Sequence, residues 1–347
     1  MTDRDHWGLR GAVQSCRLQR TWYSRRCGAD LCENEERGDT TLVEFRPDGS
    51  LARRWHHNPN GSEWAWMYEY DAAERLVTVR TENTAVPVPV QHYEYDSVGR
   101  LVRLVARTED GLDRLAESYE YDATGRKRKT FYVDLTMQGL ATHYCFEGSD
   151  YGYSAPGAVT LTTLHNTRDQ PIEVLFHDKA GRTLSRVEFV YDEAGHLLEE
   201  AQTIIAERLL PEMRTEVNPA QTEAMRALLG AGGVPVRCLH RYDAQGRRIE
   251  TRTAVFGALG RYWKSMAYND HGDQSEEISE HEQRECTIDD DGRLLESPAG
   301  PSVSRSEVRF HYDYNARNWI KKIVEARGGA DRDFLVASIE ERTLAYY

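Results

Sequence analysis

Tryptophan and tyrosine alternate along one short stretch of the sequence, at Trp64, Trp66, Tyr68 and Tyr70. Side chains two residues apart on a β-strand point to the same side, so a strand here would carry one aromatic face, with Trp55 just upstream. Such a face could stack against a sugar ring or a peptide, which makes Trp55, Trp64, Trp66 and Tyr68 the candidate ligand-binding residues. The same alternation also suits a hairpin core, in which cross-strand aromatic pairs stabilise the sheet by about 0.2–1 kcal/mol each. Because large aromatic side chains are mostly buried, we expect the packing role.

Cysteine, histidine and aspartate residues suggest two metal sites, but neither pattern is complete. Cys27 and Cys32, together with His56 and His57, resemble a zinc ligand set. The Cys-x4-Cys spacing is wide for zinc, however, and no second close pair supports it. The acidic run at residues 289–292 would suit calcium, but it lacks the downstream pattern of an EF-hand loop. We therefore expect a solvated turn there, and no metal or cofactor.

No motif of nucleophilic or phosphate chemistry occurs in the sequence. There is no Gly-x-Ser-x-Gly stretch, no glycine-rich phosphate loop, and no serine or cysteine in a recognisable catalytic context. The sequence therefore predicts a protein that is not an enzyme, with no catalytic residues.

Charge and composition exclude several classes of partner. The 347-residue chain has 44 basic and 57 acidic side chains and a net charge of −13. This charge argues against binding to nucleic acid or to an anionic membrane surface. The charged N-terminus predicts no signal peptide, and six scattered cysteines indicate a reducing compartment. We expect a cytoplasmic, bacterial protein, with signal-independent secretion as the alternative.

A repeated stretch, Tyr-Asp-x-x-Gly-Arg, must position these residues. It occurs at residues 95–100 and returns, with small changes, at 121–126, 191–196 and 242–247. Alternating apolar and polar residues on both sides predict a β-hairpin. The aspartate can accept hydrogen bonds from backbone N–H groups two or three residues on, and glycine can adopt the positive φ that the turn requires. The expected structural turn residues are Asp96, Gly99, Asp122, Gly125, Asp192, Gly195, Asp243 and Gly246.

The repeat has a period and one interruption. Successive turn aspartates such as Asp71 and Asp96 are about 25 residues apart, a spacing typical of repeat arrays. In degenerate copies, Glu74 and Ala316 replace the glycine. The larger gap before Asp243 contains an insertion at about residues 208–233. Asn218, Pro219 and Gly230 provide the cap, first-turn and stop residues of a helix near 219–229.

The repeated stretch resembles the YD repeats of Rhs proteins, the toxin complex C-component and teneurins, from about residue 40 to 325. This resemblance implies hairpins joined side by side in a sheet that spirals into a hollow shell, which in large members encloses a toxin or forms an adhesion module. The chain is much shorter than those members, and it lacks both the Asp-Pro-x-Gly-Leu-type self-cleavage boundary and a C-terminal toxin domain.

We therefore expect an all-β fold of about ten antiparallel β-hairpins, forming a twisted, spiralling or partly closed sheet with one short inserted helix. Its predicted regions are an N-terminal strand and irregular cap (1–44), the repeat sheet (45–325) and a C-terminal closing strand (326–347).

Three functions remain open at this point. The first is a non-enzymatic binding or scaffold protein that presents a broad sheet surface to a protein or glycan partner. The others are an Rhs-like shell or accessory of a bacterial toxin-delivery system, and a carbohydrate-binding module. An enzyme hidden in the insertion would need titratable groups near the helix, and no residue there requires one.

Overall fold

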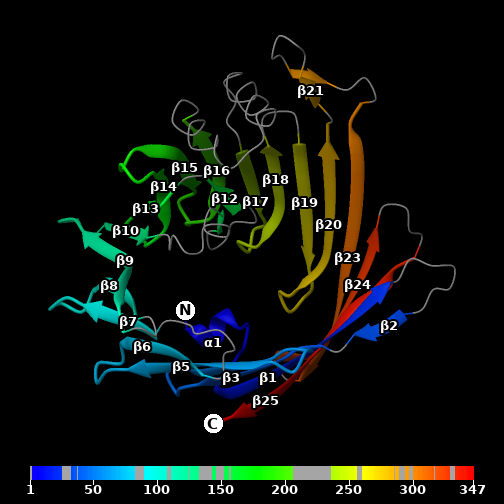
Figure 1. The fold of residues 1–347 in the computed structure, drawn as a ribbon. Coiled ribbons are helices and arrows are strands. Elements are labelled where there is room, and N and C mark those ends of the chain that lie inside the picture. The colour runs from blue at the N-terminus through cyan, green and yellow to red at the C-terminus, as the bar shows by residue number, and fades with distance from the viewer. Residues whose placement is uncertain are drawn as a thin grey trace. The chain divides into compact units, whose positions relative to one another are not determined.

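The chain folds into two compact units in the computed structural model. Figure 1 shows its strands and the short N-terminal helix, coloured from the N-terminus to the C-terminus. Unit 1 comprises Met1–Leu115, Ala267–Glu277 and Ser306–Tyr347, and unit 2 comprises Ala116–Met266 and Ile278–Arg305. The structure describes residues 2–25, 33–36, 38–82, 90–107, 111–124, 126–132, 143–145, 152–155, 158–205, 236–255, 260–284, 286–288, 294–296, 300–315, 317–328 and 333–347.

Unit 1 is an antiparallel sheet with one short helix at its N-terminus. Its strands pair in the order β23–β24–β25–β1–β3–β4–β5–β6–β7–β8, and β2 pairs with part of β1. The bounds are α1 (Asp3–His6), β1 (Val13–Arg25), β2 (Glu33–Glu36), β3 (Thr40–Phe45), β4 (Leu51–His57), β5 (Glu63–Tyr70), β6 (Leu76–Glu82), β7 (Val90–Tyr95), β8 (Leu101–Arg107), β23 (Ser302–Asn315), β24 (Asn318–Gly328) and β25 (Leu335–Tyr346).

Unit 2 is also built from antiparallel strands. They pair in the order β9–β10–β13–β14–β15–β16–β17–β18–β19, and β11 with β12 and β21 with β22 form two small separate pairs. The bounds are β9 (Asp113–Tyr121), β10 (Lys127–Tyr132), β11 (His143–Cys145), β12 (Gly152–Ser154), β13 (Thr160–His165), β14 (Pro171–His177), β15 (Thr183–Tyr191), β16 (Leu197–Ile204), β17 (Val236–Tyr242), β18 (Arg248–Val255), β19 (Gly260–Tyr268), β20 (Gln274–Gln283), β21 (Cys286–Ile288) and β22 (Leu294–Glu296). β20 pairs with β19.

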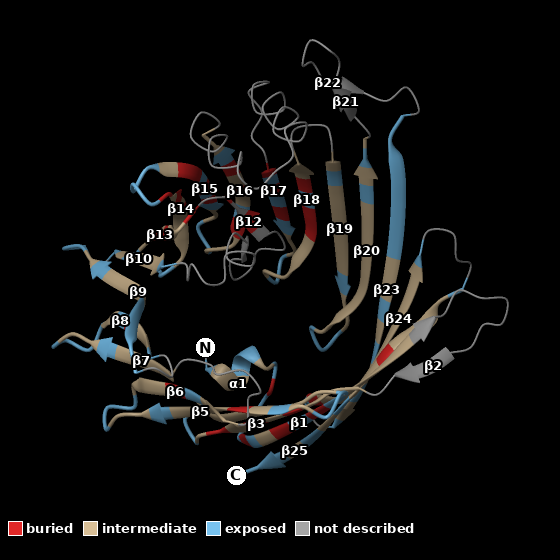
Figure 2. Cartoon of the chain, in the orientation of Figure 1, coloured by how far each residue is buried: buried red, intermediate tan, exposed pale blue. Residues whose placement is uncertain are grey.

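Burial alternates along the strands, as expected for sheets with one covered face. In β17, for example, Val236, Cys238 and His240 are buried, whereas Arg237 and Leu239 are exposed. Figure 2 shows buried segments in β15–β18 of unit 2 and in β1 and β3 of unit 1. The hydrophobic core of unit 2 consists of Tyr153, Ala155, Ala158, Leu161, Val174, Phe176, Leu184, Val187, Phe189, Leu197, Val236 and Cys238. The smaller core of unit 1 consists of Leu9, Val13, Cys16, Val43 and Phe45.

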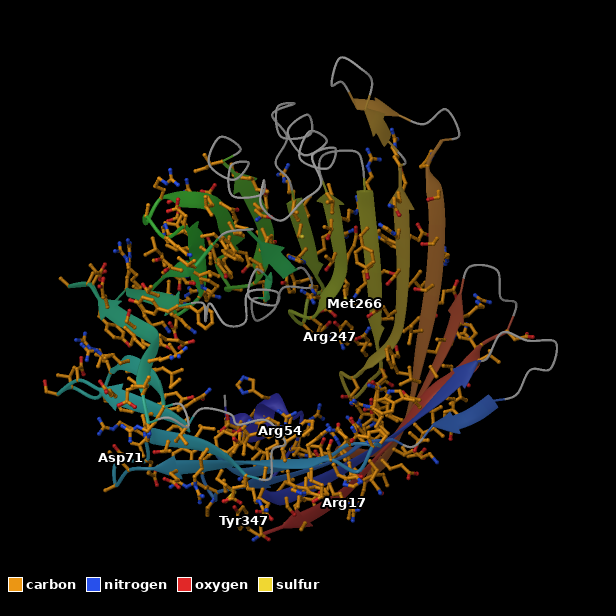
Figure 3. The ribbon with its side chains drawn as sticks, in the orientation of Figure 1. Arg17, Arg54, Asp71, Arg247, Met266 and Tyr347 are labelled. Carbon is orange, nitrogen blue, oxygen red and sulfur yellow. The ribbon has the colours of Figure 1, made fainter. Side chains whose placement is uncertain are left out.

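The Tyr-Asp stretches lie at hairpin tips. At the β7–β8 turn, Asp96 Oδ1 accepts hydrogen bonds from the backbone N–H groups of Val98 and Arg100, at 3.0 and 2.8 Å. The second donor lies four residues after Asp96, whereas the sequence predicted donors two or three residues away. Gly99, which lies between them, has a φ of +86° and returns the chain toward Asp96. In the preceding turn Glu74 takes the place of the glycine and adopts a φ of +61°. Figure 3 shows Asp71 at the end of that hairpin. The same pair of bonds occurs at Asp71, Asp122, Asn166, Asp178, Asp243 and Asn269.

The tyrosine of the stretch has a role that the sequence did not reveal. The Tyr95 hydroxyl donates a hydrogen bond of 2.7 Å to the carbonyl of Leu76, and the Tyr191 hydroxyl donates one of 2.8 Å to the carbonyl of Pro171. In each case the acceptor is the first residue of the second strand of the preceding hairpin. The motif therefore joins each hairpin to the one before it. Equivalent bonds run from Tyr70 to Leu51, from Tyr242 to Leu197 and from Tyr312 to Gln274.

The all-β prediction and the prediction of antiparallel hairpins are confirmed. The spiralling alternative is wrong, because a spiral would separate the first and last strands, whereas β1 and β25 pair along Val13–Trp22. The predicted helix near 219–229, and the insertion at 208–233, lie outside the described residues. Among the residues that are described, no helix is long and apolar enough to cross a membrane.

Candidate functional site

The predicted aromatic face lies on β4 and β5 of unit 1, where other side chains cover it. His56 stands opposite Trp64 in the strand register, and their rings are 4.7 Å apart. Arg54 stands opposite Trp66, with its guanidinium 5.1 Å from that ring. Trp64 and Trp66 also contact each other edge to face, at 5.7 Å. These partners use the ring faces that a ligand would need.

Two further observations favour packing over ligand binding at this face. The indole Nε1 of Trp64 is buried, with no hydrogen-bond partner among the described residues. Trp55 stands opposite Ala65 and stacks on His57 at 5.8 Å, so it lies on the other side of the sheet. The structure therefore brings Trp64, Trp66 and Tyr68 together on one face but does not add Trp55 to them.

A buried polar cluster occupies the covered face of β16–β18 in unit 2. Glu200 is fully buried, and its carboxylate accepts a hydrogen bond of 2.9 Å from the Tyr153 hydroxyl. The second carboxylate oxygen lies 2.8 Å from His240 Nε2, and His240 Nδ1 lies 3.1 Å from the Thr251 hydroxyl. Burial raises the pKa of the Tyr153 phenol, and the adjoining Cys238 and Glu200 raise it further.

This cluster suits a structural role better than a chemical one. Glutamate, histidine, cysteine and tyrosine together resemble a catalytic set, but the side chains of Glu200 and His240 have no exposed surface. Both ring nitrogens of His240 already have partners, and a general base must be able to reach its substrate. Satisfied buried polar groups of this kind stabilise one unique packing of a core.

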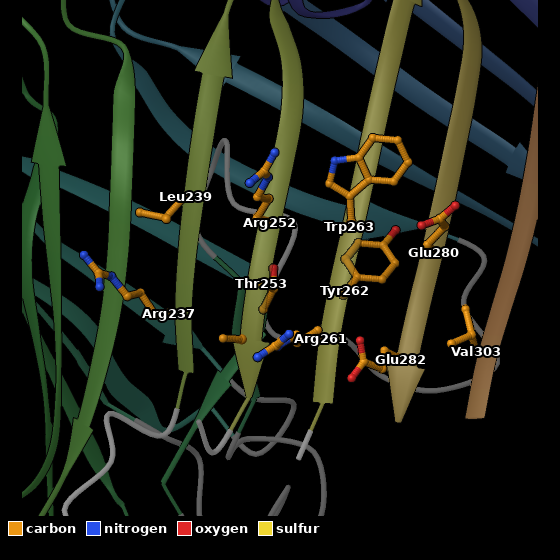
Figure 4. Close-up of a pocket in the computed structure, with 11 residues that line it drawn as sticks. Arg237, Leu239, Arg252, Thr253, Arg261, Tyr262, Trp263, Glu280, Glu282 and Val303 are labelled. Atoms are coloured by element: carbon orange, nitrogen blue, oxygen red, sulfur yellow. The ribbon is translucent and has the colours of Figure 1, made fainter. Parts of the chain in front are cut away.

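A pocket of about 600 Å³ lies on the opposite face of the same sheet, in unit 2 (Figure 4). This volume falls within the range of about 300–1,000 Å³ that is typical of ligand sites. The register places Arg252 between Leu239 and Trp263, so these three side chains share one face. The lining is completed by the part of β20 from Ile278 onward and by Val303 at the start of β23, both of which belong to unit 2 because the unit boundaries fall within these strands. The charged and aromatic lining residues are Arg237, Arg252, Arg261, Tyr262, Trp263, Glu280 and Glu282.

Charge is divided across the pocket. Three arginines come from β17–β19, and the two glutamates come from β20. Most of these groups already have partners outside the pocket. Arg237 binds Glu199 through two hydrogen bonds of 2.8 and 3.1 Å, and this pairing raises the pKa of Arg237. The remaining partners join Arg252 to Glu250, Glu280 to Arg305 and Glu282 to Arg284.

Arg261 differs from the other arginines of the pocket. It is exposed and has no ion pair or hydrogen bond with any residue that the structure describes. Trp263, two residues on, lies on the same side of β19, and Leu239 and Val303 expose 40% and 66% of their surface nearby. An unpaired guanidinium, an indole ring and two exposed aliphatic side chains can together bind an anionic group that is attached to an apolar body.

The other predicted residues form no site. The turn residues Asp96, Gly99, Asp122, Asp192, Gly195, Asp243 and Gly246 lie at separate hairpin tips, and Gly125 lies outside the described residues. Cys27, Cys32 and residues 289–292 also lie outside them. Within the described part of the chain, no group of three or more histidine, cysteine, aspartate or glutamate side chains could hold a metal ion.

Comparison with known proteins finds distant structural likenesses. No protein-family model and no curated protein matches the chain. A porin-like protein from Bacteroides uniformis is 9% identical over 96% of this chain and 98% of its own, with a TM-score of 0.28. The Photorhabdus luminescens Tc holotoxin pore is 12% identical over 86% of this chain, with a TM-score of 0.17, and the match covers 19% of the holotoxin chain. A structure from work on asymmetric conductivity of engineered proteins is 9% identical over 96% of this chain and 99% of its own, with a TM-score of 0.22.

TM-scores this low carry no argument about this chain. The resemblance to the YD-repeat family therefore stays a prediction.

Proposed function

We propose that this chain is a non-enzymatic binding protein that holds a segment of a partner protein in the pocket on β17–β20. The observation that carries the proposal is the composition of the lining, in which three arginines and Trp263 share one face with exposed aliphatic side chains. Tryptophan, tyrosine and arginine are the residue types that dominate the energetic centres of protein interfaces.

The position of the pocket supports a peptide ligand over a small glycan. It extends along strands, so an extended polypeptide could lie in it and expose alternate side chains to it. The predicted glycan platform on β5, by contrast, has its rings packed against His56 and Arg54. The ion pairs of the pocket's arginines and glutamates contribute to the orientation and specificity of a bound ligand more than to its affinity.

Selection from a displayed peptide library, with the full chain as bait, tests this proposal. The enriched peptides should bind the wild-type chain and bind Trp263→Ala at least about tenfold more weakly, since truncation of a central aromatic typically costs 2 kcal/mol or more. Val98→Ser is the matched control, because Val98 is 71% exposed on a hairpin tip in unit 1. Peptides whose binding is unaffected by Trp263→Ala, or is lost equally in Val98→Ser, would contradict the proposed function.

A further inference from the structure

We infer that the pocket selects an extended peptide segment in which a carboxylate side chain and an aromatic side chain are two residues apart. This inference rests on the proposed function and names the class of ligand that the pocket takes. The carboxylate binds Arg261, and the aromatic ring packs against Trp263.

Arg261 supplies the charge part of the recognition. Among the described residues lining the pocket, it is the arginine without a counter-ion, whereas Glu199 on the neighbouring strand β16 binds Arg237, and Glu250 on the same strand, β18, binds Arg252. A guanidinium presents five donors in a planar fork that matches a carboxylate. A ligand carboxylate is therefore the group that completes the pairing in this pocket.

The strand geometry sets the spacing within the ligand. Arg261 and Trp263 lie on the same side of β19, and residues two apart on a strand are about 6.6 Å apart along it. An extended ligand has the same repeat, so its side chains at positions i and i+2 can face Arg261 and Trp263 together. Side chains at positions i and i+1 point in opposite directions and cannot.

The far wall adds a limit on ligand charge. Glu280 and Glu282 lie across the pocket from the arginines, and each has a single arginine partner among the described contacts, at 2.9 and 3.4 Å. A ligand with acidic groups on both sides would place a carboxylate against these glutamates, where like charges repel. The pocket therefore favours one carboxylate at a defined end over a run of acidic residues.

Three labelled probe peptides test this inference by fluorescence anisotropy with the full chain. The first has the core Phe-Ser-Glu, the second has Phe-Ser-Gln, and the third has the adjacent pair Phe-Glu-Ser, each with blocked ends. We expect the first to bind about three- to tenfold more tightly than the others, the range of one half-exposed charge-assisted pair. Arg261→Gln should remove that preference and leave the weaker binding of the Phe-Ser-Gln peptide unchanged. Arg103→Gln, at an exposed arginine of β8 in unit 1, is the matched control and should change nothing.

Each alternative result is informative. Equal binding of the Glu and Gln peptides, with both lost in Trp263→Ala, overturns the inference and leaves the proposed function standing. Equal binding of the Phe-Ser-Glu and Phe-Glu-Ser peptides also overturns the inference. So does a competition experiment in which inorganic phosphate displaces the Phe-Ser-Gln peptide as well as the Phe-Ser-Glu peptide. No binding by any probe also overturns it, while library peptides that depend on Trp263 would still support the proposed function. Circular dichroism of each variant checks that the sheet is retained.

Discussion

Replacing Gly246 by alanine should destabilise unit 2 more than replacing Gly181, although both turn glycines have a φ of +75°. A β-carbon at Gly181 would have no atom within 4 Å. At Gly246 it would lie 2.6 Å from Nε2 of His196, which belongs to the turn of the preceding hairpin. His196 cannot simply give way, because it pairs with Asp192 at 2.9 Å and stacks on Tyr242 at 4.8 Å.

The expected loss of stability has two separate causes, of which the first applies to both glycines and the second to Gly246 alone. Left-handed backbone geometry costs a non-glycine residue about 1–2 kcal/mol, and this term is common to both sites. Displacing the His196 ring also loses its stack on Tyr242, which is worth about 0.5–1.5 kcal/mol. Gly181→Ala should therefore lower the free energy of unfolding by about 1–2 kcal/mol, and Gly246→Ala by roughly 1 kcal/mol more.

Urea unfolding of the two variants measures this difference, and a second background assigns its cause. Both sites are in unit 2, so one transition reports on both, and unchanged m-values would show that only stability has altered. In a His196→Ala background, the cost of Gly246→Ala should fall to that of Gly181→Ala. Equal costs in the wild type, or an excess that persists without His196, would show that contact between neighbouring turns does not set the difference.

Three further outcomes are expected. Tyr191→Phe should lower the free energy of unfolding by about 1 kcal/mol, because the Pro171 carbonyl loses its donor; no loss in thermal or urea unfolding would refute the role of the hydroxyl in joining hairpins. Glu200→Ala should cost about 3–5 kcal/mol, since it leaves a buried hydroxyl and a buried imidazole without their partner, while Glu200→Gln should cost less because it keeps an acceptor. Asp178→Asn should be less stable than the wild type at neutral pH, and the difference should vanish in acid. Burial raises the Asp178 pKa, but hydrogen bonds from the turn backbone and from Arg182 outweigh it and hold the pKa below its ordinary 3.8. The stability that the Asp178 carboxylate contributes is therefore complete above pH 3.8 and is lost as the pH falls through the lowered pKa. A stability difference between Asp178→Asn and the wild type that persists in acid unfolding curves would contradict this.

Local chemistry explains why the hairpins could be predicted from the sequence. Each turn depends on residues within five positions of one another, such as Asp96, Gly99 and Arg100, so the repeat is visible along the chain. The turn that lacks the glycine keeps the same geometry, since Glu74 adopts a positive φ at the glycine position. The pairing of β1 with β25 could not be predicted, because it joins segments from opposite ends of the chain and no short pattern specifies it. The sequence therefore predicted the repeating unit and a closing C-terminal strand, but not the strand with which that segment pairs.

The buried cluster was missed for a related reason. Glu200 and His240 stand 40 residues apart, on strands separated in sequence by the insertion, and each looks like an ordinary polar position in an alternating strand. The pairing of Glu200 with Cys238 across β16 and β17 decides that both face the core. In β17 the apolar Leu239 is exposed while Val236 and Cys238 are buried, so apolar residues alone do not identify the covered face.

Register also decides which aromatic side chains are open to a ligand. On β5, Trp64 and Trp66 alternate conspicuously in the sequence, yet the residues opposite them on β4 are a histidine and an arginine that pack on the rings. On β19, the single Trp263 attracts less notice, yet it stands opposite Arg252, which is bound to Glu250 instead. Ring packing by the cross-strand neighbours therefore covers Trp64 and Trp66, whereas Arg252 pairs with Glu250. The signal in the sequence was Arg261 and Trp263, an arginine and a tryptophan two residues apart, which a strand places on the same side.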